Sequence, residues 1–151
     1  MATIPTLSFS EHHGKFTQYL ISHPLPSTAD LFEVADFCAA FASVLVETHD
    51  VAERNALYGR LLNAFMHMER LCTNDLPAHL IDSLSAEEIP VSTMPDCWQE
   101  TDIPVSYAIA LTQALLGNNL PEPTTKALTG LLHDLVYLLA DYVKEPYIPH
   151  H

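Results

Sequence analysis

The sequence is poor in positive charge, with six lysines and arginines against nineteen aspartates and glutamates and a formal net charge of −13 over 151 residues. The imbalance comes from a shortage of lysine and arginine rather than from an excess of aspartate and glutamate. A protein that binds the nucleic-acid backbone needs a basic stripe to displace counterions, and anionic membrane surfaces attract basic segments in the same way. We therefore expect neither direct nucleic-acid binding nor a membrane partner.

Cysteine and glycine are also scarce, with three cysteines and four glycines, whereas proline is plentiful at eleven. Cys38, Cys72 and Cys97 are widely spaced and show neither a CxxC pair nor a zinc-like spacing. Such a pattern is typical of free thiols in a reducing compartment. The first ten residues lack the basic and apolar segments of a signal peptide. These features predict a cytoplasmic protein.

Catalytic motifs are missing as well, because the chain contains no GxSxG, Walker loop, GxGxxG or HExxH. Cys38 lies among apolar neighbours, where a thiol is inert, and no carboxylates are paired at a spacing that indicates acid–base catalysis. Neither His67 nor His133 has a second metal ligand at helical spacing. The sequence therefore predicts a non-enzymatic protein without catalytic, cofactor-binding or metal-binding residues.

One stretch in the first third of the chain has no charge at all, over residues 37–46. A helix that is apolar all round is buried on most sides, and this run is far shorter than the about 20 residues of a bilayer span. Phe37, Phe41 and Leu45 recur at i, i+4 and i+8, the spacing of side chains that pack on one helix face. The stretch predicts a core helix, which Ser27 or Thr28 would cap.

The segment that follows has the pattern of a partner helix. Asp50 and Glu53 have the spacing of a capping box. An apolar stripe comes next, formed by Leu57, Leu61, Phe65, Met68 and Cys72. Because the connection at residues 49–50 is short, we expect the two helices to form an antiparallel hairpin over about residues 28–73.

Prolines delimit the other expected elements. These are an extended arm over residues 1–9, helices over about 11–22, 77–84, 104–116 and 124–144, and a C-terminal tail over 145–151. The last helix has a wide apolar face and should pack beside the core helix. The pattern requires no strand, and residues 91–93 are the only candidate for one. The fold class is an all-α, single-domain bundle of five to six helices spanning residues 1–151.

A polar stripe follows one face of the helix predicted for residues 51–73, opposite its leucines. Half of all lysines and arginines lie on this helix. The stripe is either a solvated outer face or a contact for an anion or an acidic peptide. Its members, at i, i+3, i+7 and i+10, are Arg60, Asn63, His67 and Arg70.

A second candidate site lies between Arg70 and Lys126, where the chain has no lysine or arginine. One sign of charge over such a length gives a negative lobe that steers a basic partner. Trp98, the single tryptophan, lies in its middle and is either an interface anchor or a plug that fills the bundle under a loop. The candidate partner-binding residues are Trp98, Met94, Glu87, Glu88, Asp96, Glu100 and Asp102.

Together these features favour a non-enzymatic acidic helical protein that acts by protein–protein binding, as an adaptor, a chaperone, an immunity protein or an inhibitor. In size and charge alone the chain resembles secretion chaperones, immunity proteins and phage-encoded inhibitors. That resemblance implies another protein as partner, and the acidic lobe favours one with a basic surface. The alternative is a helical bundle that binds a metal or a small ligand through His49, His67 or His133.

Self-association is a further prediction, because the chain has too few charges to give every outer helix a polar face. A homodimer that buries the last helix would resolve the mismatch, and two-fold pairing is the commonest solution. Since a net charge of −13 opposes association, the dimer should tighten as salt screens the charge. Light scattering at low and high ionic strength tests this, and a monomer at both would rule it out. The face expected to pair is Leu131, Leu135, Leu138 and Tyr142.

Overall fold

Residues 14–150 are described in the computed structural model of the chain. Residues 14–22 are helical, and a 3-10 turn, η1, covers Asp96–Trp98. The arm predicted for residues 1–9 lies outside the described part. The remaining helices are α2 (Leu31–Leu45), α3 (Val51–Thr73), α4 (Ala78–Ser83), α5 (Asp102–Leu116) and α6 (Glu122–Tyr142).

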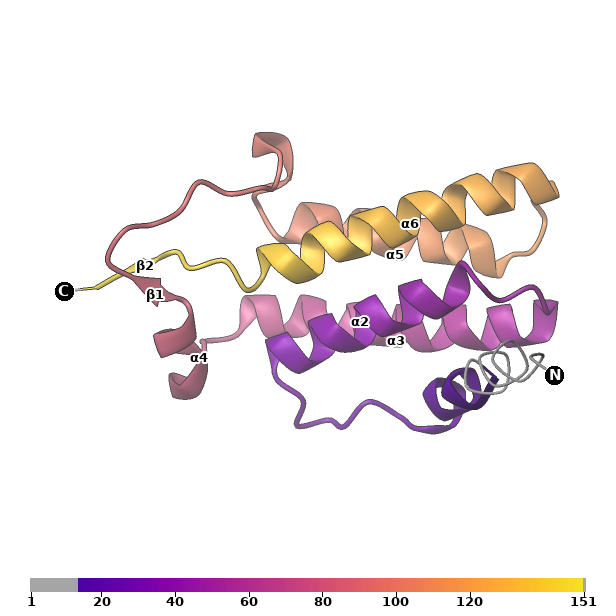
Figure 1. Ribbon diagram of the computed structural model, residues 1–151, viewed down its shortest axis with the longest axis horizontal. Helices are drawn as coiled ribbons and strands as arrows, with labels where there is room; N and C mark the ends of the chain where they lie inside the picture. The colour runs from indigo at the N-terminus through magenta and orange to yellow at the C-terminus, as the bar shows by residue number, and fades with distance from the viewer. Residues whose placement is uncertain (1–13, 151) are drawn as a thin grey trace, which may run out of the picture.

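Four of these helices form an up-down-up-down bundle (Figure 1). Each contacts two others in the cyclic order α2, α3, α5, α6, so that α6 returns against α2. The predicted all-α class is confirmed, as are the antiparallel hairpin of α2 with α3 and the packing of the last helix beside α2. Within residues 14–150 no helix combines the length and the hydrophobicity that a bilayer span requires.

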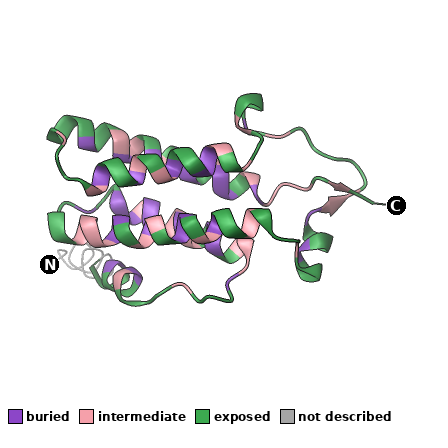
Figure 2. Ribbon diagram, turned by 180° about the vertical axis from the view of Figure 1, so that it is seen from behind, coloured by how far each residue is buried: buried purple, intermediate pink, exposed green. Residues whose placement is uncertain are grey.

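The core lies between the facing sides of the four helices (Figure 2). Helix α2 contributes buried residues to both of its neighbours, and its central Phe41 is 1% exposed. Tyr58 of α3 is equally buried, and its hydroxyl lies 3.0 Å from that of Thr129 on α6. Because Thr129 donates its own proton to the carbonyl of Thr125, Tyr58 is the donor. This bond satisfies a polar group that would be costly to bury alone.

The N-terminus of α2 differs from the prediction, because the cap is Asp30 rather than Ser27 or Thr28. The Asp30 carboxylate accepts from the Glu33 amide at 2.9 Å, and the Glu33 carboxylate accepts from the Asp30 amide at 3.0 Å. A turn closed by the Ala29 amide on the Pro26 carbonyl delays the start of the helix.

At the start of α3 the predicted capping box is half formed. Asp50 is the N-cap, and its carboxylate accepts from the Glu53 amide at 2.9 Å. The Glu53 carboxylate does not accept from the backbone amide of Asp50. It accepts instead from the side-chain amide of Gln18 at 3.3 Å. Glu53 therefore helps to attach the N-terminal helix to α3.

The expectation of an all-helical chain without strands is wrong in one place. Strand β1 (Ser85–Ala86) pairs in parallel with β2 (Ile148–Pro149), close to the chain terminus (Figure 1). The amide of Tyr147 donates to the carbonyl of Leu84 at 2.9 Å, which extends the pairing. A two-residue pairing needs no alternating sequence pattern, so hydrophobic periodicity does not reveal it. The C-terminal tail is thereby fixed to the segment between α3 and α5.

Replacement of Phe41 by alanine should lower the free energy of unfolding by about 3–5 kcal/mol, because it leaves a cavity where α2 meets its neighbours. The matched control is Phe16→Ala, since Phe16 is 45% exposed and surface changes usually stay within about 0.5 kcal/mol. Urea denaturation of both variants measures the difference. A loss below about 1 kcal/mol for Phe41→Ala would contradict its place in the core.

Candidate functional site

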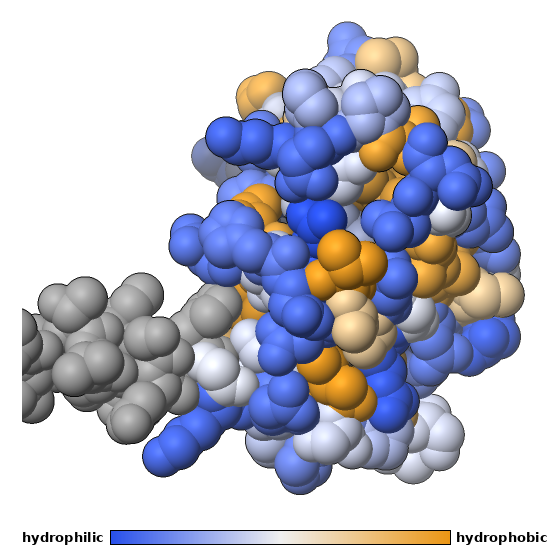
Figure 3. All heavy atoms as spheres, turned by 90° about the vertical axis from the view of Figure 1, so that its right-hand side faces the viewer, coloured by the Kyte–Doolittle hydropathy of each residue, from blue (hydrophilic) through white to orange (hydrophobic). Residues whose placement is uncertain are grey.

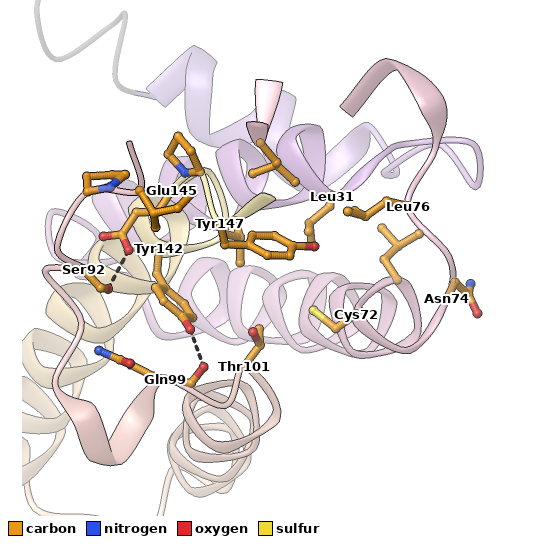
Figure 4. A pocket seen from close by; sticks show the side chains of 16 residues that line it. Leu31, Cys72, Asn74, Leu76, Ser92, Gln99, Thr101, Tyr142, Glu145 and Tyr147 are labelled. Atoms are coloured by element: carbon orange, nitrogen blue, oxygen red, sulfur yellow. Dashed lines mark hydrogen bonds between the residues drawn. The ribbon is translucent and has the colours of Figure 1, made fainter. Parts of the chain in front are cut away.

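A cavity of about 470 Å³ lies at one end of the bundle. We call it the end cavity. Its walls come from the start of α2, the ends of α3 and α6, and the segment over residues 74–101 (Figure 4). Its volume falls in the range of small-ligand pockets. The lining residues are Leu31, Leu71, Cys72, Asn74, Leu76, Leu84, Ile89, Pro90, Ser92, Gln99, Thr101, Tyr142, Val143, Glu145, Pro146 and Tyr147.

The cavity exists because the chain leaves the bundle between α3 and α5 instead of turning tightly. We call residues 74–101 the excursion. It loops away from the helix ends, and the C-terminal tail crosses it through the β1–β2 pairing (Figure 1). At its start, the Nε2 atom of His79 on α4 lies 2.9 Å from the Asp30 carboxylate at the start of α2. The excursion is thus attached to the bundle at more than one point.

Glu145 is the main anchor of the excursion, because its carboxylate accepts three hydrogen bonds from it (Figure 4). The Ser92 hydroxyl donates one of them. The Thr93 amide and hydroxyl donate the others, at 3.1 and 2.9 Å. Partial burial disfavours the charged carboxylate, but these bonds outweigh burial and hold the pKa of Glu145 below its usual value. Glu145 is therefore a charged structural acceptor at neutral pH.

Tyr142 and Gln99 close the other side of the cavity. The Tyr142 hydroxyl donates to the Gln99 carbonyl (Figure 4). The side-chain amide of Gln99 donates to the Met94 carbonyl at 3.1 Å and lies 3.3 Å from an Asp96 carboxylate oxygen. Burial and the negative charge of Glu145 raise the pKa of Tyr142, so its hydroxyl stays protonated and remains a donor. These contacts hold η1 beside the cavity.

Cys72 lies on the cavity wall and is half-buried, although the sequence placed it on the core stripe of α3. The excursion leaves the bundle just after this residue and does not cover it. Burial, followed by the charges of Asp102 and Glu69, raises the pKa of the Cys72 thiol to about 11. At neutral pH this sulfur is a thiol and not a nucleophilic thiolate.

The predicted partner-binding residues divide into two groups. Met94 is 2% exposed and does not offer a surface to a partner. Trp98 is half-buried against the core, and its ring meets that of Tyr107 edge-on at 6.2 Å. Part of the Trp98 side chain is thus used inside the protein, and its role as an interface anchor stays a prediction. The acidic members are exposed, namely Glu87, Glu88, Asp96, Glu100 and Asp102.

The polar stripe of α3 is divided too. The Arg60 guanidinium donates to the carbonyl of Ile21 at 3.0 Å, so it holds the N-terminal helix. Asn63, His67 and Arg70 line a second hollow of about 460 Å³, beside residues 23–30, the linker that leads to α2. We call it the linker hollow. Burial and the Arg70 charge lower the pKa of His67, which is therefore neutral at pH 7.

The histidines proposed for the alternative function lie on separate elements. His49 is exposed in the α2–α3 turn, and His67 is on α3. His133 is on α6, 3.0 Å from Asp134 and against the Tyr137 ring. Among residues 14–150, no three histidines, cysteines, aspartates or glutamates are placed to hold one metal ion. The metal-binding form of the alternative gains no support from the described residues.

The face proposed for a homodimer is not continuous in the structure. Leu131 is 49% exposed, but Leu135 is 3% exposed and belongs to the core. Leu138 and Tyr142 are half-buried. Because α6 packs against both α2 and α5, its wide apolar face is used largely inside the bundle. Leu135 is therefore wrong as a dimer contact, and self-association itself stays a prediction.

The opposite end of the bundle carries apolar residues interspersed with polar ones (Figure 3). Val46 and Val51, which flank the α2–α3 turn, are 41% and 45% exposed. Apolar residues scattered singly over a protein surface are normal and do not define a site. The end cavity remains the stronger candidate.

Comparison of the chain with protein-family models, curated proteins and solved structures finds no match. The end cavity is therefore characterised by its own residues. Sequence patterns did not indicate Glu145 and Tyr147 of the C-terminal tail, nor Ser92, which lies far from them in the chain. A single acid directly before Pro146 is too common a feature to mark an anchor.

Replacement of Glu145 by glutamine should loosen the excursion, because a neutral amide accepts hydrogen bonds more weakly than a carboxylate. In the unchanged protein, a lowered pKa means that the anchoring is complete above about pH 4.5, the usual value, and is lost as the pH falls through the lower folded value. The NMR shift of the Thr93 amide should follow that loss, and Glu145→Gln should abolish the pH dependence. Glu100→Gln is the control, and the same titration of Thr93 in both variants would contradict the role of Glu145.

Proposed function

We propose that this protein is a non-enzymatic binding protein that takes a short, basic and apolar segment of a partner protein into the end cavity. The observation that carries the proposal is the position of this cavity beside the base-free, acidic excursion. A role as adaptor, chaperone, immunity protein or inhibitor is compatible with such binding.

The charge beside the cavity favours a basic partner. Asp75 lies between two lining residues, Glu88 precedes the lining residue Ile89, and Glu100 lies between Gln99 and Thr101. All three acids are exposed. Exposed acids around a cavity attract lysine or arginine and speed the encounter with a basic partner.

The walls of the cavity favour an apolar side chain with peptide groups on either side. Leu31 and Leu76 supply apolar surface, and Tyr147 extends across the cavity towards them (Figure 4). Asn74 and Thr101 add polar groups that can bond to a peptide backbone. Apolar anchors that enter a pocket inside a polar rim carry most of the energy at protein interfaces.

The titratable groups of the cavity support binding rather than catalysis. The Cys72 thiol has a raised pKa and is protonated at neutral pH. The Glu145 carboxylate accepts three hydrogen bonds, and the Tyr142 hydroxyl donates to the backbone carbonyl of Gln99. A general base needs an acceptor that is free to take a proton from the substrate, and these groups are already engaged.

The compartment and the assembly remain part of the proposal. Cys38, Cys72 and Cys97 are all free thiols, which supports a reducing environment such as the cytoplasm. Homodimerisation stays a prediction for light scattering to test, and the exposed Leu131 supports it better than the buried Leu135. A monomer would leave the end cavity fully available to a different protein.

Replacement of Ile89 by serine should weaken peptide binding about tenfold, since Ile89 lines the cavity and is 47% exposed, and loss of its aliphatic contact with the peptide costs about 1–2 kcal/mol. Suitable probes are synthetic peptides with two leucines between lysine pairs, compared with glutamate-flanked and serine-centred versions. Fluorescence of Trp98, the single tryptophan, and calorimetry measure the affinity. Binding of the lysine–leucine peptide should fall as salt rises.

The matched control for Ile89→Ser is Val91→Ser. Both residues are apolar and belong to the excursion, but Val91 is 96% exposed and does not line the cavity. Its replacement should leave peptide affinity unchanged. Equal losses in the two variants, or equal binding of the glutamate-flanked peptide, would overturn the proposed function.

A further inference from the structure

The linker hollow is a second concave site, adjacent to the end cavity and of opposite chemistry. It lies between the linker that leads to α2 and the second half of α3, and it shares Leu71 and Asn74 with the end cavity. The linker runs alongside the α2–α3 layer before it enters α2 (Figure 1). The hollow has about 460 Å³, and its lining is Leu25, Ser27, Asn63, His67, Arg70, Leu71 and Asn74.

Among residues 14–150, no carboxylate lines this hollow, although the whole chain has nineteen acids against six lysines and arginines. The positive group of the hollow is the guanidinium of Arg70. Since His67 is neutral at pH 7, it adds a ring N–H donor rather than a second charge.

Arg70 differs from the basic residues that support the fold. Arg54 lies 3.6 Å from Glu122, and Lys144 pairs with Asp36. Arg60 donates to the carbonyl of Ile21. Within the described range 14–150, the Arg70 side chain makes no ion pair and no hydrogen bond. Its donors are therefore available to a ligand.

The other polar side chains of the hollow are available in the same way. Asn63 and Asn74 each carry an amide with two N–H donors, and Ser27 carries a hydroxyl. Across residues 14–150 none of these three side chains makes a hydrogen bond. We propose that the linker hollow binds an oxyanion, a phosphate or carboxylate group, through the Arg70 guanidinium and the side-chain donors of Asn63, Asn74 and Ser27. A guanidinium binds both kinds of group through two parallel hydrogen bonds.

This site differs from the peptide site of the proposed function because it selects the opposite charge and is centred on Arg70, which does not line the end cavity, although the two cavities share Leu71 and Asn74. The test is an NMR titration of the full chain with sodium phosphate and, separately, with sodium acetate. Sodium chloride at matched ionic strength is the reference. The side-chain amides of Asn63 and Asn74 and the Nε–H of Arg70 should shift together and saturate.

Arg70→Gln should weaken oxyanion binding at least about tenfold, which corresponds to the loss of about 1.4 kcal/mol. Lys126→Gln is the charge-matched control, since it removes one positive charge from an exposed position on α6 that does not line the hollow. Its affinity should equal that of the unchanged protein. Circular dichroism checks that both variants remain folded.

The two arms distinguish the sources of the oxyanion. Saturation by phosphate alone assigns a phosphate group, by acetate alone a carboxylate, and by both a general oxyanion site. Shifts that chloride reproduces, shifts that do not saturate, or equal affinity in Arg70→Gln would overturn the proposal. Ile89→Ser should leave oxyanion binding unchanged, so failure of the peptide site and failure of this site are separable.

Discussion

The burial of α2 is the constraint on which the rest of the structure depends. The central part of α2 contains no charged side chain, so its apolar surface is unfavourable in water. Helices α3 and α6 cover that surface. Phe41 is buried where α2 meets its neighbours, and the hydrogen bond from Tyr58 to Thr129 joins α3 to α6 across the interior. Helix α5 then closes the ring between α3 and α6. Apolar burial, rather than ion pairing, holds this bundle together.

Scarcity of bases decides how the surface is organised around that core. Arg54, Arg60 and Lys144 fix elements to one another, so few positive charges are left to neutralise the excursion. Its acids repel one another and favour an expanded loop. The contacts of Glu145 and Tyr142 oppose that repulsion. The end cavity lies between the rigid bundle and this negatively charged, anchored segment.

Much of the fold could be predicted because helix formation and capping follow local rules. The stripe from Leu57 to Met68 is buried as expected, and Asp50 caps α3. The cap of α2 was misplaced because Ser27, Thr28 and Asp30 are all good N-cap residues. Only the turn before Asp30 selects among them. Local preference thus identifies helices better than it identifies their first residue.

The sequence by itself determined the helical bundle, its central hairpin and the acidic character of the excursion, since periodicity and charge are properties of neighbouring residues. Tertiary structure alone decided which groups meet. It placed Glu145 against Ser92 and Thr93, and it packed Trp98, half-buried, against the core. It also separated Arg60 from the rest of the polar stripe. Contacts between distant segments depend on how whole helices pack, and no local pattern encodes them.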